Sequence, residues 1–301
     1  MPSRQNLRRA IIVTVSVVAV LAVVWIIAVA RAETAQPTAF FDRLGANTPL
    51  IASDVSRSAI WPENTLSAIR ASSAIGVDVV AVDVRLTQDG VPVLVRDETV
   101  DRTTDGSGLV SEIALPDLLE LDAAYSFQPQ GADGYPFRGL NIQVPTLEDV
   151  LREFDQLFLI LFLREADTRL LEEVQRLLRE YDRETSVIVQ IDSDEALAVF
   201  TERVPSLALG ATPAEIRRFF ILHLMFSSGA HTPESHVFIT SPENASQYPS
   251  RRFIRDAAGQ GLRTGVRTTG DGSGYQILFN RDVDLIISPI PDRAMSVLGR
   301  L

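Results

Sequence analysis

The chain has 301 residues, 46% of them apolar, so its length fits one large domain with a substantial core. It contains no cysteine, which excludes disulfide bonds and thiolate metal sites, and no lysine, so all 28 cationic side chains are arginine. The net charge of −11 argues against a nucleic-acid partner, which requires a basic face.

An uncharged apolar run at residues 10–30 follows Arg4, Arg8 and Arg9. About 20 helical residues at roughly 1.5 Å each span about 30 Å, the thickness of a hydrocarbon core. We therefore expect a cytoplasmic N-terminus at 1–9, a single-pass membrane anchor at 10–30, and an extracytoplasmic remainder. The alternative is a cleaved signal peptide and a secreted domain, because Ala28-Val29-Ala30 fits a small-x-small cleavage rule. The part after residue 30 holds 25 arginines and 39 acidic residues, so we do not expect it to lie flat on an anionic leaflet.

Residues 31–47 are polar, contain Pro37 and predict an irregular linker to a domain at 48–301. In that domain, strand-like apolar runs alternate with amphipathic helical stretches. The predicted strands are Leu50–Ala52, Val79–Leu86, Phe158–Leu163, Val187–Ile191, Leu207–Leu209, Val237–Ile239, Arg263–Val266 and Leu285–Ser288. The predicted helices include Leu66–Ile75, Leu147–Phe154, Thr168–Tyr181, Glu195–Arg203 and Pro213–Met225. This rhythm predicts a TIM-type (β/α)8 barrel, with a doubly wound open sheet as the alternative.

Two further segments interrupt the rhythm. Val91–Val95 reads as a hairpin return after the Asp89-Gly90 turn, and Thr103–Pro145 is a long excursion that contains glycine and proline. We expect both to lie outside the alternating strands and helices.

The most informative motifs lie between Leu50 and Leu121. They include Pro62-Glu63-Asn64-Thr65, in which Asn64 is expected to cap the next helix, and Val82-Asp83-Val84-Arg85-Leu86-Thr87-Gln88-Asp89-Gly90. Arg96-Asp97 follows them, and Val144-Pro145-Thr146-Leu147-Glu148-Asp149 and Val283–Ser288 come later. In this order and spacing, the motifs resemble the glycerophosphodiester phosphodiesterase family over about residues 49–295. The resemblance implies a β/α barrel of phosphodiesterase type and hydrolysis of phosphoric diesters in glycerophospholipid metabolism.

The resemblance also implies a divalent cation, calcium or magnesium, and two histidines that transfer protons. This chain departs from that pattern at most of the matching positions. The family's His-Arg-Gly reads here Ser53-Asp54-Val55, its Glu-x-Asp reads Ala81-Val82-Asp83, and its His-Asp reads Arg96-Asp97. Its Glu-x-Lys reads Phe162-Leu163-Arg164, and its Trp-Thr-x-Asn reads Val266-Arg267-Thr268-Thr269. Both histidines are replaced, and Asp83 is the one retained metal ligand because Ala81 and Phe162 replace the other two. We therefore expect an impaired hydrolase without a cofactor; if it is active, the cofactor is calcium or magnesium.

Arginines stand at several of these positions. Because alternate strand residues face the same side, Arg85 shares a face with Asp83, and Arg164 shares one with Phe162. Arg85, Arg96, Arg164 and Arg267, with Asp97 and Glu63, are the candidate anion-binding residues at the C-terminal rim of the barrel. The predicted ligand is a phosphorylated compound or a lipid head group. The alternative is a neutral network in which these arginines pair with Asp54, Asp83, Asp97 or Glu63.

Three functions follow as hypotheses. The first is a membrane-anchored member of the family that binds anions or acts as a scaffold, and the second is an active phosphodiesterase with a rearranged metal site. The third is a structural partner of a membrane complex, with residues 213–236 as its interface. That segment contains the apolar run from Phe219 to Phe226, which is either a core helix or an exposed ridge. His223, His231 and His236 are irregularly spaced, which favours structural roles over a metal site.

Overall fold

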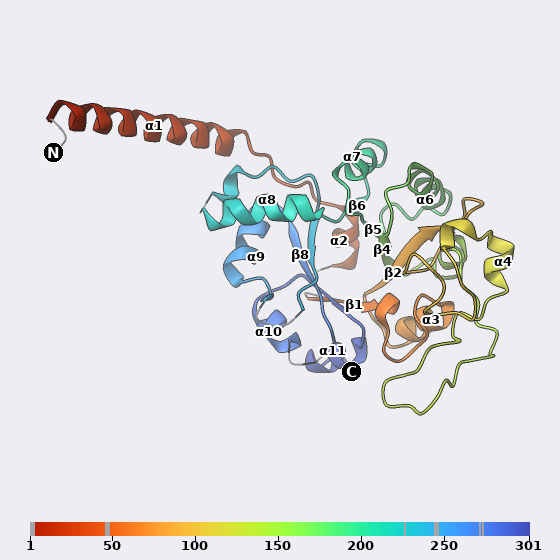
Figure 1. Ribbon diagram of the computed structural model, residues 1–301. Coiled ribbons are helices and arrows are strands. Elements are labelled where there is room, and N and C mark those ends of the chain that lie inside the picture. Colours follow the sequence, from red (N-terminus) through yellow and green to blue (C-terminus); the bar gives the residue numbers. More distant parts are fainter. Residues whose placement is uncertain (1–3, 46–48, 226, 244–246, 271, 273) are drawn as a thin grey trace.

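The computed structural model describes all residues except 1–3, 46–48, 226, 244–246, 271 and 273. Eight parallel strands form its central sheet in the order β6-β5-β4-β2-β1-β9-β8-β7. Their bounds are β1 Leu50–Asp54, β2 Val79–Leu86, β4 Phe158–Leu163, β5 Val187–Gln190, β6 Ala208–Leu209, β7 Val237–Thr240, β8 Arg263–Arg267 and β9 Leu285–Ser288. A bridge between Gly210 and Val237 joins the two end strands. The sheet is therefore a nearly closed barrel, as predicted, and not an open doubly wound sheet (Figure 1).

Helices surround the barrel (Figure 1). They are α3 Leu66–Ala74, α4 Leu115–Leu119, α5 Leu147–Glu153, α6 Thr168–Glu180, α7 Asp194–Arg203, α8 Pro213–Leu224, α9 Arg251–Ala258, α10 Tyr275–Asn280 and α11 Pro291–Val297. Three single-turn 3-10 helices are η1 Val55–Arg57, η2 Val110–Glu112 and η3 Ser228–Ala230. Side-chain caps set several helix starts, among them Thr146 and Asp149, which form a capping box at α5. The predicted strands and helices lie at or within two residues of these bounds.

The barrel core follows from the alternation of strand residues. Inward-facing side chains such as Ala52, Ala81, Ile160 and Ile287 form one buried cluster inside the barrel. The residues between them, such as Val80 and Leu161, pack outward against the helices. Because the strands are buried on both faces, they read as nearly continuous apolar runs in the sequence.

A short helix, α2 Ala39–Leu44, lies in the segment that we predicted to be an irregular linker. Its Phe40 is fully buried and packs edge-on against Phe158 at the start of β4, with ring centroids 5.2 Å apart. The helix therefore covers the N-terminal opening of the barrel. Pro37 and the polar composition of the segment gave no sign of the buried Phe40.

The first helix, α1 Arg4–Arg31, projects away from the barrel (Figure 1). Its part from Ile12 to Arg31 is long and apolar enough to cross a membrane, and none of it is buried by the rest of the chain. A signal sequence meets the same criteria of length and composition.

The hairpin return after β2 is shorter than predicted. It consists of β3 Pro92–Val93, antiparallel to β2. The excursion that follows contains η2 and α4 and has its own small core, which includes Val100 and Leu118. It ends at Thr146, which bridges back to Val93. The loop between β2 and β4 is thereby held over the C-terminal side of these strands.

Candidate active site

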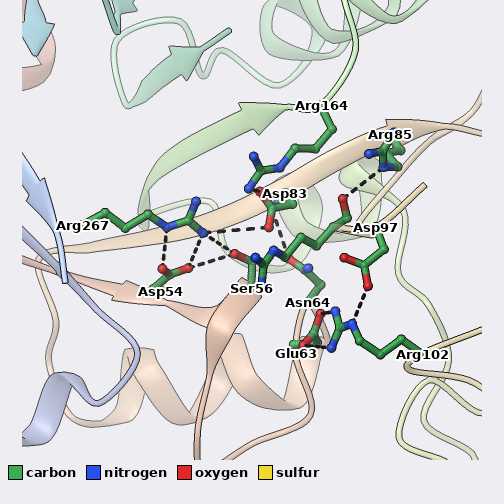
Figure 2. A network of polar contacts seen from close by, with 11 residues as sticks. Asp54, Ser56, Glu63, Asn64, Asp83, Arg85, Asp97, Arg102, Arg164 and Arg267 are labelled. Atoms are coloured by element: carbon green, nitrogen blue, oxygen red, sulfur yellow. Dashed lines mark hydrogen bonds and ion pairs between the residues drawn. The ribbon is translucent and has the colours of Figure 1, made fainter. Parts of the chain in front are cut away.

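Charged side chains meet at the C-terminal ends of β1, β2, β4 and β8 (Figure 2). Asp54 is the last residue of β1, Asp83 lies near the end of β2, and Arg267 is the last residue of β8. These residues continue the inward-facing positions of their strands, so their side chains lie above the apolar interior. Active sites of (β/α)8 barrels are built at this face.

Arg267 and Asp54 form a buried bidentate ion pair. Arg267 Nε donates to Asp54 Oδ2 at 2.6 Å and its Nη2 donates to Oδ1 at 2.8 Å. Ser56 Oγ accepts from the same Nη2 and donates to Asp54 Oδ1. Burial alone would lower the pKa of Arg267, but its hydrogen bonds with Asp54 and the charges of Asp54 and Asp83 outweigh burial and raise it. Arg267 therefore stays charged, and its two hydrogen bonds hold the Asp54 carboxylate in one orientation.

Asp83, which the sequence suggested as a retained metal ligand, is fully buried and pairs with arginine. It forms an ion pair with Arg164, and Arg267 Nη2 lies 3.9 Å from its Oδ2. Its backbone N–H donates to Asn64 Oδ1 at 3.1 Å. Asn64 therefore does not cap α3 as expected; Thr65 accepts the capping bond from the Ala68 N–H instead. Asn64 has a φ of +53°, a conformation that is rare outside glycine and is found at functional sites.

The divalent cation implied by the resemblance does not fit these residues. Ala81 and Phe162 offer no oxygen ligand, and Phe162 pairs in register with Asp83 on the neighbouring strand. The guanidinium of Arg267 lies over the Phe162 ring, 4.2 Å from its centroid. Among the described residues, no three acidic or histidine side chains converge as a metal site. A cation here would meet arginines where it needs carboxylates.

The site contains more positive than negative side chains. Arg57 lies in η1, directly after β1, and burial lowers its pKa, with Arg267, Arg96 and Arg164 adding repulsion and Asp54 opposing them. Its Nε is buried without a hydrogen-bond partner. In the described part of the chain, neither Arg57 nor Arg96 forms an ion pair. The inner cluster therefore holds four arginines against two aspartates.

Sequence reasoning missed Arg57 and Ser56. Both lie in η1, outside the family motifs used to select candidates, although they follow the strand that ends at Asp54. Ser53, expected at the position of a family histidine, does not point into the barrel. It lies on the outer side of β1, where its Oγ is 2.7 Å from Ser72 Oγ of α3. The inward-facing position at this strand end is Asp54, because alternation places Ala52 and Asp54 on one side.

The other candidates form a second, outer group. Glu63 and Asp97 both accept hydrogen bonds from Arg102, a residue that the sequence did not single out (Figure 2). Arg85 donates from Nε to the Arg96 carbonyl, and its Nη1 lies 4.0 Å from Glu165. Of the carboxylates named in the alternative of a neutral network, Asp54 pairs with Arg267 and Asp83 with Arg164, whereas Glu63 and Asp97 pair with Arg102.

Two cavities open side by side at this end of the barrel and share Asp192. One of about 740 Å³ is lined mainly by polar residues, among them three arginines and four acidic residues: Arg85, Arg96, Arg164, Asp97, Glu98, Glu165 and Asp192. The other, of about 720 Å³, is more apolar and is lined in part by residues of α8 and α9. Together they offer a charged half and an apolar half to a ligand.

The three histidines have separate structural partners. His223 Nδ1 is 2.7 Å from Asp256 Oδ2, and His231 Nε2 is 3.3 Å from Glu215 Oε1. His236 Nδ1 accepts from the Leu209 N–H. Each histidine thus has a partner of its own within the fold.

Comparisons with known proteins agree with this architecture. The model of the glycerophosphoryl diester phosphodiesterase family matches residues 56–288. A glycerophosphodiester phosphodiesterase of Caldanaerobacter subterraneus subsp. tengcongensis is 34% identical over 154 residues, which cover 50% of this chain and 60% of that relative. The chain therefore matches less than two thirds of that relative's length.

Solved structures show the same fold. The glycerophosphoryl diester phosphodiesterase domain of Rv2277c from Mycobacterium tuberculosis superposes with a TM-score of 0.69 at 21% identity, covering 83% of this chain and all of that one. A phosphodiesterase of Oleispira antarctica, solved with the product sn-glycerol-3-phosphate, gives a TM-score of 0.67 at 22% identity and covers 83% of this chain and 97% of that one. These structures show that the fold is a (β/α)8 barrel. The chain belongs to the glycerophosphoryl diester phosphodiesterase family.

Proposed function

We propose that this protein is a membrane-anchored member of the family that binds an anionic phosphate-bearing ligand and has lost most or all hydrolytic activity. The observation that carries the proposal is the cluster of four arginines and two aspartates, in which Arg57 and Arg96 lack an ion pair within the described residues. Two cationic groups without a carboxylate partner, beside a polar cavity, favour a negatively charged ligand.

The buried pairs support the same function. Arg267 neutralises Asp54, and Arg164 neutralises Asp83, so neither aspartate repels an incoming anion at full strength. Arginine binds phosphate through planar, bidentate hydrogen bonds and stays charged at any physiological pH. Arg96 and Arg164 both line the polar cavity, and Arg57, which lines a separate cavity, lies close enough for the charges of both to act on it. These side chains would hold a phosphate group in place of a metal ion.

The same residues argue against efficient hydrolysis. General acid–base catalysis requires a group that both loses and accepts a proton near neutral pH. Asp54 is bound to Arg267, and Arg96, which stands where the family has a histidine, is permanently protonated. The charge stabilisation that a divalent cation supplies in relatives has no ligand set here. Binding is therefore better supported than turnover.

The anchor supports a ligand from the membrane surface. Retention of α1 would tether the barrel to the bilayer, with its N-terminus in the cytoplasm and the barrel on the other side. A lipid head group or a soluble glycerol phosphate shares the required chemistry, a phosphate on a small polyol. The apolar cavity beside the arginines could take part of an acyl chain.

Calorimetric titration of the detergent-solubilised full chain with sn-glycerol 3-phosphate tests binding, with glycerol as the uncharged control. Loss of one charge-assisted contact costs about 1.5–3 kcal/mol, so Arg57→Ala and Arg96→Ala should each weaken binding roughly tenfold to a hundredfold. Arg102→Ala is the matched control, because it removes the same charge from an arginine already neutralised by Glu63 and Asp97. Absence of binding by the parent protein would refute the proposal.

A hydrolysis assay addresses the second candidate, an active phosphodiesterase with a rearranged site. Family membership favours this candidate. Glycerophosphocholine would be incubated with the full chain in calcium, magnesium or manganese, and glycerol 3-phosphate measured. We expect no metal-dependent release. Turnover that requires a metal and disappears in Asp83→Ala would establish the active enzyme instead.

A further inference from the structure

The helix α1 touches the barrel near the loop that follows α8. Trp25 Nε1 donates a hydrogen bond to Ser227 Oγ at 3.0 Å. Val29 lies beside η3, close enough that its Cγ1 would be 4.0 Å from a Cβ placed on Gly229. Residues 25–29 of α1 therefore lie against the chain that leads from α8 into η3 (Figure 1).

The position of this contact along α1 determines how deep the contact would lie in a membrane. Trp25 lies six residues before Arg31, the last residue of α1. At about 1.5 Å per residue, the contact is about 9 Å from the end of the helix. If residues 10–30 span the hydrocarbon core, Trp25 lies five residues, or about 7.5 Å, inside its outer edge, near the head-group boundary where tryptophan is enriched. Elements that lie in this boundary penetrate about 5–10 Å. The end of α8 must then lie at the membrane surface.

The same end of α8 carries an exposed apolar surface. Phe220, Ile221, Leu224 and Met225 are between 47% and 67% exposed, whereas Phe219 is fully buried in the core. Their spacing of three and four residues places Ile221, Leu224 and Met225 on one side of the helix. This exposure distinguishes α8 from α10 and α11, which each expose only one large apolar side chain among the described residues. The predicted apolar run is therefore both a core helix and an exposed ridge; Phe226, its last residue, lies outside the described residues.

The charge of this segment also fits an approach to lipid. Residues 216–233 contain no aspartate or glutamate, although the chain after residue 30 has 39 acidic residues. Arg217 and Arg218 stand at the start of this acid-free segment and are exposed. Asp194, Glu234 and Asp256 lie beside α8 in space but pair with Arg218 and Arg252, so an acidic domain would be repelled only weakly from an anionic leaflet at this end of α8.

We propose that the C-terminal end of α8, from Phe220 to Met225, is a second membrane contact that inserts its apolar side chains into the outer lipid boundary beside α1. The inference rests on α1 remaining as an anchor and is independent of anion binding. The contact would fix the orientation of the barrel on the bilayer. Phe220 also lines the apolar cavity at the barrel mouth, so this cavity would open close to the lipids.

Single-cysteine labelling tests the contact in the full chain, because the chain has no cysteine of its own. Met225→Cys would carry an environment-sensitive fluorophore in liposomes of phosphatidylcholine and phosphatidylglycerol. Quenching by spin-labelled acyl chains reports contact with lipid, and quenching by iodide reports contact with water. Leu140→Cys is the matched control, since Leu140 is 61% exposed and lies in the excursion between β2 and β4. Val18→Cys, in the middle of α1, reports whether the anchor spans the bilayer.

We expect the label at 225 to be quenched by the spin-labelled lipids and protected from iodide, with the opposite result at 140. Quenching at 225 by iodide alone, with lipid quenching at 18, would show that α1 spans the bilayer while α8 stays in water, and would overturn the proposal. Protection from both quenchers would assign the surface to another protein chain. Absence of lipid quenching at 18 would remove the anchor on which the inference depends and would also overturn it.

Discussion

The buried pair of Arg267 and Asp54 makes the sharpest test of how this site is built. Their side chains are 3% and 0% exposed and are joined by two hydrogen bonds of 2.6 and 2.8 Å. Substitution Arg267→Met would leave the Asp54 carboxylate buried with Ser56 as its remaining hydrogen-bond donor. Removal of one partner of a buried ion pair costs about 3–5 kcal/mol. For a domain of this size, that corresponds to a fall in Tm of about 6–20 °C.

Thermal unfolding of the full chain in detergent, followed by circular dichroism at one scan rate, measures this loss. The matched control is Arg102→Met, because Arg102 also binds two carboxylates but is 50% exposed. Exposed ion pairs contribute at most about 1 kcal/mol, so the Tm of the control should change by only a few degrees.

The double variant Asp54→Leu/Arg267→Met removes both charges at once. We expect it to recover at least half of the lost Tm, because an apolar pair of similar volume can replace a buried ion pair at little cost. If Arg267→Met lowers the Tm no more than Arg102→Met does, the pair is screened by solvent and the reasoning fails. A double variant less stable than either single variant would also contradict it.

Two further predictions concern the barrel frame. Phe40→Ala should lower the free energy of unfolding by about 3–5 kcal/mol, because Phe40 fills the N-terminal opening; a loss below about 1 kcal/mol in denaturant titrations would show that α2 is dispensable. Burial lowers the pKa of His236 below its ordinary value of 6.5, while its Nδ1 accepts from Leu209 where β6 meets β7. The unfolded chain therefore binds the proton more tightly, so stability from His236 is complete above about pH 6.5 and is lost as the pH falls through the lower folded pKa. His236→Asn, which keeps an acceptor but does not titrate, should lose less stability than the parent between pH 7 and 5; equal losses in urea titrations would refute this role.

The sequence by itself determined the frame of this protein. Strands buried on both faces must be apolar throughout, so Val79–Leu86 and Phe158–Leu163 were predicted with their observed bounds. Alternation along these strands also placed Asp83 and Arg164 at the inner rim. The expected replacement of the family's histidines and metal ligands rests on the resemblance and on residue identity, and it stays a prediction.

The tertiary structure decided which charges meet. Asp54 and Arg267 are 213 residues apart and come together because β8 reaches β1 through β9, a relation that no local pattern contains. The tertiary structure also places Arg57 in the site and Ser53 outside it. It pairs Arg102 with Glu63 and Asp97. Ion pairing depends on distances of a few ångströms between elements remote in sequence, whereas the periodicity of a strand is visible in consecutive residues of the sequence. The frame could therefore be predicted from the sequence, and the balance of charge inside it could not.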